Sequence, residues 1–266
     1  TLKPRYFLLE NVKMKKEYED VITQHLGVKP IEINSALVSA QDRKRLYWTN
    51  IPGVTQPEDK GIVLKDIVES QGEFSYIPNE KIKNKVYKKN YLQWDVNGKG
   101  HFSQGQRAYY LDNKHGTLDT TCYSNSKILL PDGRVRRTTI TEKELLQTLP
   151  VGYTKSINES QASKAIGNGW TVDVIAHILS FMPEKHLHTV VSLFDGISCG
   201  QVALERAGKI YNQYYASEID KYAIAVTQKN YPHTIQLGDV TKIDWNAFLD
   251  RLDLIQNVPC QGSYWG

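Results

Sequence analysis

Short apolar runs and helical segments alternate regularly from residue 190 to residue 258. The apolar runs predict strands at residues 190–194, 214–217, 235–237 and 252–258, and the segments between them predict helices at 200–207, 221–230 and 245–249. Strands that alternate with single helices across short loops are typical of a parallel sheet covered by helices. The expected fold is therefore α/β, with a doubly wound, mostly parallel sheet.

The first part of the chain contains further elements and one long irregular region. Apolar runs predict strands at residues 5–9, 31–38 and 47–51, and helical spacing predicts helices at 15–26, 141–149 and 171–182. The helix at 141–149 is expected to begin at Thr141, with Glu144 completing a capping box, and to stop before Pro150. Residues from about 53 to 137 are rich in Gly, Asn, Lys and aromatic residues and indicate a small separate lobe, with a strand at 127–130.

The composition limits the environment of the chain. No apolar stretch approaches the ~18 residues of a membrane helix. Residues 1–9 lack the order of charged, apolar and small residues that marks a signal peptide, so a cytoplasmic setting is expected. The three cysteines are far apart, and neither a Cys-x-x-Cys pair nor a His-Glu-x-x-His pattern occurs. We therefore expect neither a disulfide framework nor a metal site, and we interpret His186-Leu187-His188 as linker sequence within a seam at residues 183–189.

Basic residues are concentrated in the irregular region. The formal net charge is only +4, but eight basic residues lie between residues 81 and 115 against Asp95 and Asp112. Six aromatic residues are interleaved with them. This pattern fits either a solvated loop region or a surface that binds nucleic acid.

Three successive predicted strands end in groups that suit an adenosine cofactor. The first end carries Asp195, Gly196 and Gly200, the second carries Glu218, and the third carries Asp239. Ligands of open α/β sheets bind at the carboxyl ends of the strands, and a carboxylate about 20 residues after a glycine turn is placed to accept from ribose hydroxyls. The glycines do not follow the Gly-x-Gly-x-x-Gly pattern of dinucleotide sites, and a carboxylate beside the turn favours the positively charged S-adenosylmethionine. Glycines and carboxylates are also common at strand ends without any ligand.

The fourth predicted strand ends in Pro259-Cys260-Gln261. A cysteine at the carboxyl end of a strand beside a cofactor site can act as an attacking thiolate. A half-buried, unreactive cysteine is the alternative interpretation.

Taken together, these motifs resemble those of the C5-cytosine DNA methyltransferases. The matching segments are Phe194-Asp195-Gly196-x-Ser198-x-Gly200, Glu218, Gly238-Asp239-Val240, Pro259-Cys260-Gln261, Glu10-Asn11-Val12, Gln41-x-Arg43-x-Arg45, Arg136-Arg137 with the Thr and Glu residues that follow, and Ala165-Ile-Gly167-Asn168-Gly169-Trp170. The resemblance covers most of the chain outside residues 53–133. It divides the chain into a second part of the catalytic domain at 1–52, a target-recognition lobe at 53–135, return helices at 136–185, and a cofactor-binding part with the nucleophile at 186–266.

The resemblance implies a role for each motif residue in the transfer of a methyl group from S-adenosylmethionine to a flipped-out cytosine of double-stranded DNA. Cys260 would bond to C6 of the cytosine ring, Glu10 would hold N3 and share its proton, and Asn11 would support the Glu10 loop. Arg43 and Arg45 would steady the base, with Arg43 expected nearer the ring.

The same resemblance implies cofactor and DNA contacts. The cofactor residues would be Phe194 against adenine, Glu218 on the ribose and Asp239 on the adenine amine, together with Asp195, Gly196, Ser198, Gly200, Ile219, Val240, Pro259, Asn168 and Trp170. The DNA-binding candidates are Gln41, Lys88, Lys89, Arg107, Arg136 and Arg137.

The order of the motifs differs from the usual order of the family. Family members run from the cofactor motifs through the cysteine to Glu-Asn-Val, whereas here Glu10-Asn11-Val12 comes first, as in a circular permutation. The family's mobile loop between the cysteine and Glu-Asn-Val is not matched, and a second polypeptide or an unmatched segment is expected to supply it. Asn257-Val258 also replaces the small residues that usually precede Pro-Cys. The leading hypothesis is a bacterial or phage enzyme of the restriction-modification type, associated with the nucleoid; an RNA cytosine methyltransferase and an inert DNA-binding relative are the alternatives.

Overall fold

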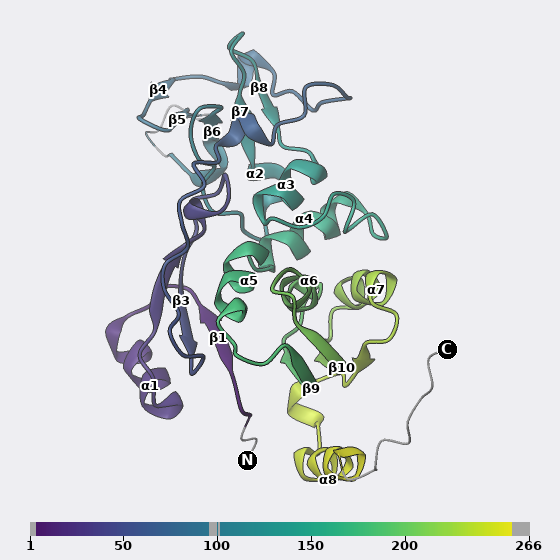
Figure 1. Ribbon diagram of the computed structural model, residues 1–266. Helices are drawn as coiled ribbons and strands as arrows, with labels where there is room; N and C mark the ends of the chain where they lie inside the picture. The colour runs from purple at the N-terminus through teal and green to yellow at the C-terminus, as the bar shows by residue number, and fades with distance from the viewer. Residues whose placement is uncertain (1–3, 96–99, 101, 257–266) are drawn as a thin grey trace.

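The computed structural model describes residues 4–95, 100 and 102–256. Figure 1 shows one sheet at the top, a layer of helices in the middle and two smaller sheets below. The mixed α/β class expected from the sequence is confirmed. Within these described ranges no helix is both long enough and apolar enough to cross a membrane.

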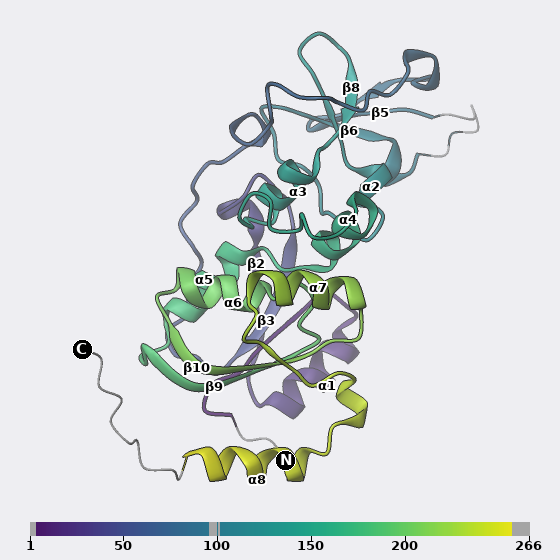
Figure 2. The same cartoon turned by 90° about the vertical axis from the view of Figure 1, so that its right-hand side faces the viewer.

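A parallel sheet occupies the lower right of Figure 1. Its strands are β9 (His186–Leu193), β10 (Ile210–Ser217) and β11 (Ile235–Gln236), in the order β11-β10-β9. Helices α6 (Cys199–Arg206) and α7 (Lys221–Asn230) connect these strands and cover the same face of the sheet (Figure 2). The loops that follow the three strands therefore meet at one edge of the sheet, where ligands of such sheets bind.

Strand β9 begins earlier than predicted. His186-Leu187-His188 is part of this strand rather than a linker, and Leu187 pairs with Tyr211 of β10. The two histidines are exposed, whereas Leu187 is half-buried. This alternation with a period of two is the pattern of a strand with one face toward water, and the polar composition concealed it.

The predicted strand at residues 252–258 is wrong over its described part. Helix α8 (Trp245–Gln256) continues through these positions, whereas the prediction ended the helix at Leu249. Apolar residues at positions 245, 248, 249, 252 and 255 follow the spacing of one helix face. Phe248 at the start of α8 packs edge-on against Tyr215 of β10, with ring centroids 5.0 Å apart. That contact places α8 on the opposite face of the parallel sheet from α6 and α7 (Figure 2).

The second lower sheet is antiparallel. Strands β1 (Leu8–Asn11), β2 (Ile31–Asn34) and β3 (Lys44–Thr49) are arranged in the order β1-β3-β2. Helix α1 (Lys16–Leu26) packs beside this sheet, where the Trp48 indole donates a hydrogen bond to the Thr23 hydroxyl at 2.9 Å. Arg5, just before β1, forms an ion pair with Glu184, just before β9. The two lower sheets are therefore joined where these two strands begin.

The main hydrophobic core lies between the lower sheets and the helices above them. Helices α4 (Glu159–Asn168) and α5 (Val172–Ser180) supply fully buried residues such as Ile166, Ile175 and Ile178, and α6 packs against α5. Ile33 from β2 and Leu118 from the irregular region enter the same core. The core therefore joins segments that are distant in the sequence.

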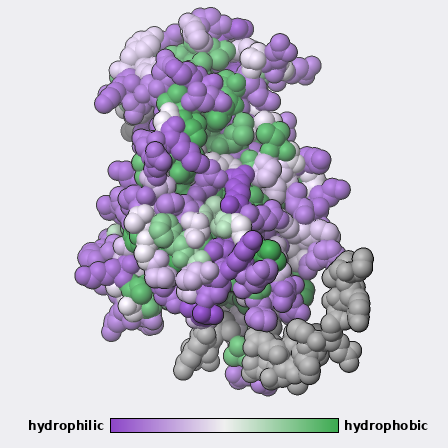
Figure 3. Space-filling model, viewed as in Figure 1, coloured by the Kyte–Doolittle hydropathy of each residue, from purple (hydrophilic) through white to green (hydrophobic). Residues whose placement is uncertain are grey.

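The upper sheet has five short strands. They are β4 (Val86–Tyr87), β5 (Tyr91–Gln93), β6 (Arg107–Tyr110), β7 (Lys127–Leu129) and β8 (Val135–Arg137), in that order across the sheet. A small hydrophobic core of its own, which includes Leu92, Trp94 and Val135, lies on this sheet. The short helix α2 (Cys122–Asn125) connects it to the helices below. On the face shown in Figure 3, hydrophilic residues cover most of the upper sheet, and hydrophobic residues appear mainly in the region beneath it.

The N-cap of helix α3 (Ile140–Leu146) lies two residues before the predicted cap. Its N-cap is Thr139 and the capping box is completed by Glu142, whereas the prediction named Thr141 and Glu144. Glu144 instead accepts hydrogen bonds from the backbone N–H groups of Gly152 and Thr154, at 2.6 and 2.8 Å. Three threonines, Thr138, Thr139 and Thr141, lie close together here and offer several possible caps, and Glu142 pairs with only Thr139.

Candidate active site and cofactor-binding edge

Glu10 and Arg45 form a largely buried ion pair on neighbouring strands. Glu10 lies on β1 and Arg45 on β3, and the Nε atom of Arg45 is 2.9 Å from Oε1 of Glu10. Burial raises the pKa of the Glu10 carboxyl, while the charges of Arg45 and Arg43 and a hydrogen bond with Trp170 oppose that rise. A carboxyl group with a raised pKa is suited to share a proton with a bound base. Next to Glu10, the Asn11 side chain accepts a hydrogen bond from the Val12 N–H at 2.8 Å.

Arg43 is engaged with backbone rather than with Glu10. Its guanidinium donates to the carbonyl oxygens of Leu118 at 2.7 Å and Gly169 at 3.1 Å, and its side chain is buried. Burial lowers the pKa of Arg43 to about 10. The expectation that Arg43 lies nearer the reacting base than Arg45 stays a prediction, whereas the structure pairs Arg45 with the carboxylate and uses Arg43 to join segments of backbone.

The end of helix α4 closes one side of this site. Asn168 is exposed, and Trp170 is half-buried beside Glu10. A Cβ atom built on Gly169 would lie 3.1 Å from Sγ of Cys199, so this helix end packs closely on the start of α6. The Glu10 site and the edge of the parallel sheet are therefore adjacent, with Trp170 between them.

The turn after β9 is unusual in its backbone. Phe194, Gly196 and Ser198 have φ angles of 56°, 59° and 57°, which is the left-handed region. Such a conformation costs a non-glycine residue about 1–3 kcal/mol and persists only where neighbouring contacts hold it. The outcome is that the Phe194 ring projects into solvent with 77% of its surface exposed, at the edge where the three strand ends meet.

Glu218 holds the same turn from the end of β10. Its Oε2 atom accepts a hydrogen bond from the Gly196 N–H at 2.8 Å, and Oε1 accepts from the N–H groups of Ile219 and Asp220 at 2.7 and 2.8 Å. The Ile219 side chain is 75% exposed next to it. Glu218, Ile219 and Phe194 therefore lie together at one edge.

Asp195 lies beneath the turn instead of facing outward. Its carboxylate accepts a hydrogen bond from the Tyr214 hydroxyl at 2.8 Å and another from the Ser198 hydroxyl, and burial raises the pKa of the Asp195 carboxyl. With about nine-tenths of its surface buried, Asp195 supports the turn from below. Direct contact between Asp195 and a cofactor, as expected from the sequence, does not fit this placement.

Asp239 follows the third strand, β11. Its side chain accepts from the N–H and hydroxyl of Thr241 at 2.9 and 2.7 Å, and these hydrogen bonds lower the pKa of its carboxyl. Gly238 accepts a hydrogen bond from the Ser217 hydroxyl at 2.7 Å, which joins this loop to the end of β10. Val240 begins the short turn that Asp239 caps.

The DNA-binding candidates divide into buried and accessible residues. Gln41 is fully buried, and its amide donates to the Leu146 carbonyl at 2.9 Å while its oxygen accepts from the Leu118 N–H at 2.8 Å. Arg136 has 1% of its side chain exposed and is paired with Glu142 at 2.6 Å. Neither side chain is available to DNA, and both instead support the fold.

The other four candidates reach the surface. Lys88 and Lys89 are exposed, Arg107 is half-buried over the Tyr91 ring at 4.9 Å from its centroid, and Arg137 donates to the Ser75 hydroxyl at 2.8 Å. All four belong to the upper sheet or its turns.

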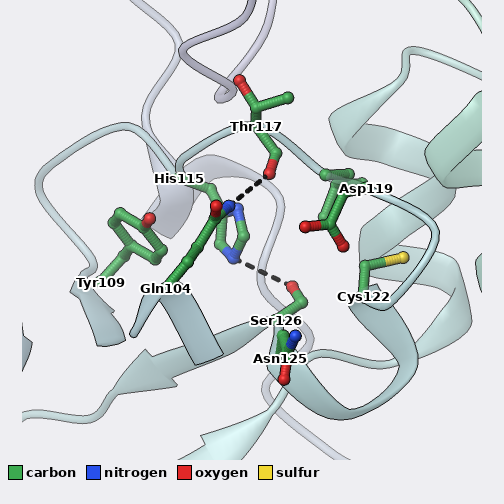
Figure 4. A pocket seen from close by; sticks show the side chains of 9 residues that line it. Gln104, Tyr109, His115, Thr117, Asp119, Cys122, Asn125 and Ser126 are labelled. Atoms are coloured by element: carbon green, nitrogen blue, oxygen red, sulfur yellow. Dashed lines mark hydrogen bonds between the residues drawn. The ribbon is translucent and has the colours of Figure 1, made fainter. Parts of the chain in front are cut away.

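A junction between the upper sheet and the Gln41–Arg45 segment was not foreseen from the sequence. His115 exchanges backbone hydrogen bonds with Ala40 and Asp42, each 2.7 Å long, and its ring lies 2.9 Å from the Ser126 hydroxyl (Figure 4). Burial lowers the pKa of His115 to about 4, so the ring is neutral at physiological pH. The amine of Lys114 donates to three backbone carbonyls, among them Ala36 at 2.7 Å. A polar histidine and lysine in an irregular stretch gave no sequence signal for this role.

The predicted nucleophile, Cys260, lies outside the described residues, as do Pro259 and Gln261. The two cysteines that are described, Cys122 and Cys199, are free and buried. Burial raises the pKa of their thiols to about 11 and about 12. Neither is a nucleophile at neutral pH, because the thiolate is the attacking species.

Comparison with known proteins shows which family the chain belongs to. A family model described as C-5 cytosine-specific DNA methylase matches residues 1–183 and 188–265. The chain therefore belongs to the C-5 cytosine-specific DNA methylase family.

Individual relatives match more limited stretches. The chain is 28% identical to the type II methyltransferase M1.ScrFI of Lactococcus lactis subsp. cremoris, over 54% of this chain and 38% of that protein. It is 27% identical to the type II methyltransferase M.NlaX of Neisseria lactamica, over 68% and 63%. It is 39% identical to the orphan methyltransferase M.Rho11sI of Bacillus phage rho11s, over 27% and 15%. The chain thus spans less than two thirds of each of these relatives.

Proposed function

We propose that this chain carries the catalytic machinery of a DNA (cytosine-5)-methyltransferase that uses S-adenosylmethionine and acts on a cytosine flipped out of double-stranded DNA. The observation that carries the proposal is the buried Glu10–Arg45 ion pair, with its N–O distance of 2.9 Å, beside Trp170 and next to the cofactor edge. Membership of the C-5 cytosine-specific DNA methylase family supports the same reaction.

The chemistry requires a nucleophile and a proton donor on one ring. Cytosine C5 is a weak nucleophile, and addition of the Cys260 thiolate to C6 makes the ring electron-rich at C5. Glu10 compensates the developing charge by sharing a proton with N3, and Arg45 fixes the orientation of the Glu10 carboxyl. After methyl transfer, loss of the C5 proton breaks the S–C6 bond and frees the thiol.

The chemical groups of the cofactor edge suit S-adenosylmethionine. Phe194 offers an exposed ring for the adenine, and the carboxylates of Glu218 and Asp239 lie at the ends of the next two strands. When bound, S-adenosylmethionine supplies the methyl group as a sulfonium. Trp170 would lie between this edge and the base, with Ile219, Val240 and Asn168 around the adenosine. In this proposal the parallel sheet of β9, β10 and β11 forms one half of the doubly wound sheet that the sequence predicts.

The upper sheet is proposed as the target-recognition lobe. Its accessible basic residues, Lys88, Lys89, Arg107 and Arg137, would contact phosphates, since such contacts fix a protein on DNA without reading its sequence. The aromatic residues Tyr87 and Phe102, which are 68% and 42% exposed, belong to the same surface. Similarity to type II and phage methyltransferases favours a bacterial or phage restriction-modification role in the cytoplasm.

Transfer of a labelled methyl group from S-adenosylmethionine to unmethylated duplex DNA, followed by bisulfite sequencing, tests this proposal. We expect methylation in one fixed sequence context, and loss of transfer with retained DNA binding in Cys260→Ser. Cys122→Ser is the matched control, because that thiol is buried and donates to the Ser163 carbonyl at 3.0 Å, and it should remain active. DNA binding without transfer in the unaltered chain would favour an inert relative, and transfer to RNA alone would favour an RNA enzyme.

A further inference from the structure

The hydroxyl of Tyr214 reaches Asp195 beneath the strained turn. Tyr214 lies on β10, 3% of its surface is exposed, and its hydroxyl is 2.8 Å from Oδ1 of Asp195. A Cβ atom at position 200 would lie 2.9 Å from the same hydroxyl, closer than real Cβ atoms normally approach. The absence of a side chain at Gly200 therefore leaves room for Tyr214 to contact Asp195 across the start of helix α6.

This contact is one end of a buried chain of polar groups. The other carboxylate oxygen of Asp195 accepts from the Ser198 hydroxyl, which in turn accepts from the Gln201 amide at 3.0 Å. The Gln201 amide also donates to the Thr234 hydroxyl at 2.8 Å, just before β11. The chain of hydrogen bonds thus runs under the turn from β10 toward the third strand of the sheet.

The turn needs support of this kind because of its backbone. Phe194 and Ser198 are non-glycine residues with left-handed φ angles, on either side of Asp195 and Gly196. Glu218 holds the turn from outside through the Gly196 N–H, at 2.8 Å, and Asp195 holds it from inside. The inner carboxylate takes hydrogen bonds from Ser192, Ser198 and Tyr214, and of these Tyr214 is the one that comes from the neighbouring strand β10.

We propose that Tyr214 is a positioning residue for the cofactor: by binding Asp195 it holds the strained turn that presents the Phe194 ring to the adenosine. Tyr214 is buried and acts through Asp195, without touching the cofactor. This inference rests on the proposed function of the turn as the adenosine site. It predicts that the loss of one buried hydroxyl weakens cofactor binding while the chemical step is unaffected.

Titration calorimetry with S-adenosylhomocysteine tests the proposal on the full chain. Tyr214→Phe keeps the ring and removes the hydrogen bond, and the expected result is about tenfold weaker binding, the effect of losing one buried hydrogen bond. Tyr215→Phe is the matched control on the same strand, because its hydroxyl binds Gln213 at 2.8 Å and not Asp195. That control should bind as tightly as the unaltered chain.

A kinetic measurement separates positioning from a general loss of structure. For Tyr214→Phe we expect KM for S-adenosylmethionine to rise about tenfold, while kcat at saturating cofactor and DNA stays within about twofold. A parallel fall in kcat with unchanged KM would overturn the proposal. Asp195→Asn can still accept a hydrogen bond from Tyr214, so it should weaken binding less than Tyr214→Phe, and additive losses in the double variant would also overturn it.

A third variant distinguishes failure of the proposed cofactor site from failure of the role proposed for Tyr214. Phe194→Ala should abolish binding of S-adenosylhomocysteine if the turn is the adenosine site. If the unaltered chain does not bind, or if Phe194→Ala binds normally, the cofactor site itself is misplaced. If Phe194→Ala loses binding while Tyr214→Phe binds normally, only the role of Tyr214 is refuted.

Discussion

At the scale of single residues, Glu10 combines two opposing influences. Burial raises the pKa of its carboxyl, and Arg45 at 2.9 Å, with Arg43 farther back, stabilises the charged form. Ionisable groups under such opposing influences are common at catalytic sites. Arg43 has a different role, because its guanidinium donates to the backbone carbonyls of Leu118, Gly167 and Gly169 and holds them in place.

Replacement of Glu10 by Gln should remove the proton transfer and keep the shape of the site. We expect kcat for methyl transfer to fall by about 10²–10⁴-fold, the usual contribution of a positioned acid or base. Glu17→Gln on helix α1, where the Glu17 side chain is 63% exposed, is the control and should retain activity. Methyl transfer assays under saturating cofactor and DNA would measure both, and an active Glu10→Gln variant would contradict the assigned role.

The pKa of Glu10 also predicts how stability depends on pH. Because the pKa is raised in the folded state, the folded protein binds the proton more tightly than the unfolded chain, and this contribution is present at low pH and lost as pH rises through the folded pKa. The Gln side chain does not titrate. Urea unfolding from pH 4 to pH 8 should therefore show Glu10→Gln gaining stability relative to the unaltered chain as pH rises; a constant difference would show that the pKa is not raised.

At the scale of elements, the ion pair between Arg136 and Glu142 fixes the junction of β8 with α3. Both side chains are 1% exposed, and Arg136 contacts both carboxylate oxygens, at 2.6 and 2.9 Å. Glu142 also accepts from the Thr139 N–H at 2.9 Å as part of the capping box. One carboxylate thus fixes the end of a strand and the start of a helix.

Removal of this charge should destabilise the fold strongly. Glu142→Gln leaves Arg136 buried without its counter-ion, and a loss of about 3–5 kcal/mol of unfolding free energy is expected. The control is Asp132→Asn, which breaks an exposed pair with Arg134 and should change the unfolding free energy far less. Urea denaturation measures both, and equal effects would contradict a special role for the buried pair.

Elements with unambiguous local signals were predictable from the sequence. The helix at Lys221–Asn230 has a capping Asp220 and was placed at its observed bounds, as was the C-terminal end of α1 before Gly27. Helix α8 and strand β9 differ from the prediction for opposite reasons. Leu252, Leu254 and Ile255 have a spacing that fits either a strand or a helix, whereas two histidines hide the start of strand β9. The sequence reveals the motif residues as a set, but it does not reveal which of them are buried. It therefore predicts ligand contacts for Gln41, Arg136 and Asp195, whereas in the structure these side chains are buried and form hydrogen bonds within the fold.

At the scale of the whole molecule, the upper sheet is fixed to the lower part through the segment that contains His115 and Leu118. Arg43 holds this segment from one side, and α4 meets it at Gly167, where a Cβ atom would lie 2.1 Å from the Asp119 carbonyl oxygen. The proposed recognition lobe and the Arg45 site are therefore joined by close backbone packing, which restricts movement of the lobe relative to that site.

A methyl group at position 167 should disturb this junction. Gly167→Ala forces Asp119 to shift, and overpacking of this kind costs about 1–3 kcal/mol. Ser160→Ala, at an exposed position on the same helix, should change stability by less than about 0.5 kcal/mol. Thermal unfolding measures the stability, and hydrogen exchange of residues 115–121 should increase only in Gly167→Ala; unchanged exchange there would contradict the tight junction.

The contact between position 200 and the Tyr214 hydroxyl also sets an order in which this protein can change over generations. While the hydroxyl lies 2.9 Å from the place of a Cβ atom, alanine at position 200 is obstructed. Once position 214 carries phenylalanine, the obstruction is gone and alanine becomes acceptable. Loss of the hydroxyl therefore makes room for a methyl group at position 200, and that methyl group then opposes a return of the hydroxyl. The residue at each of these two positions thus limits which residues the other position can accept.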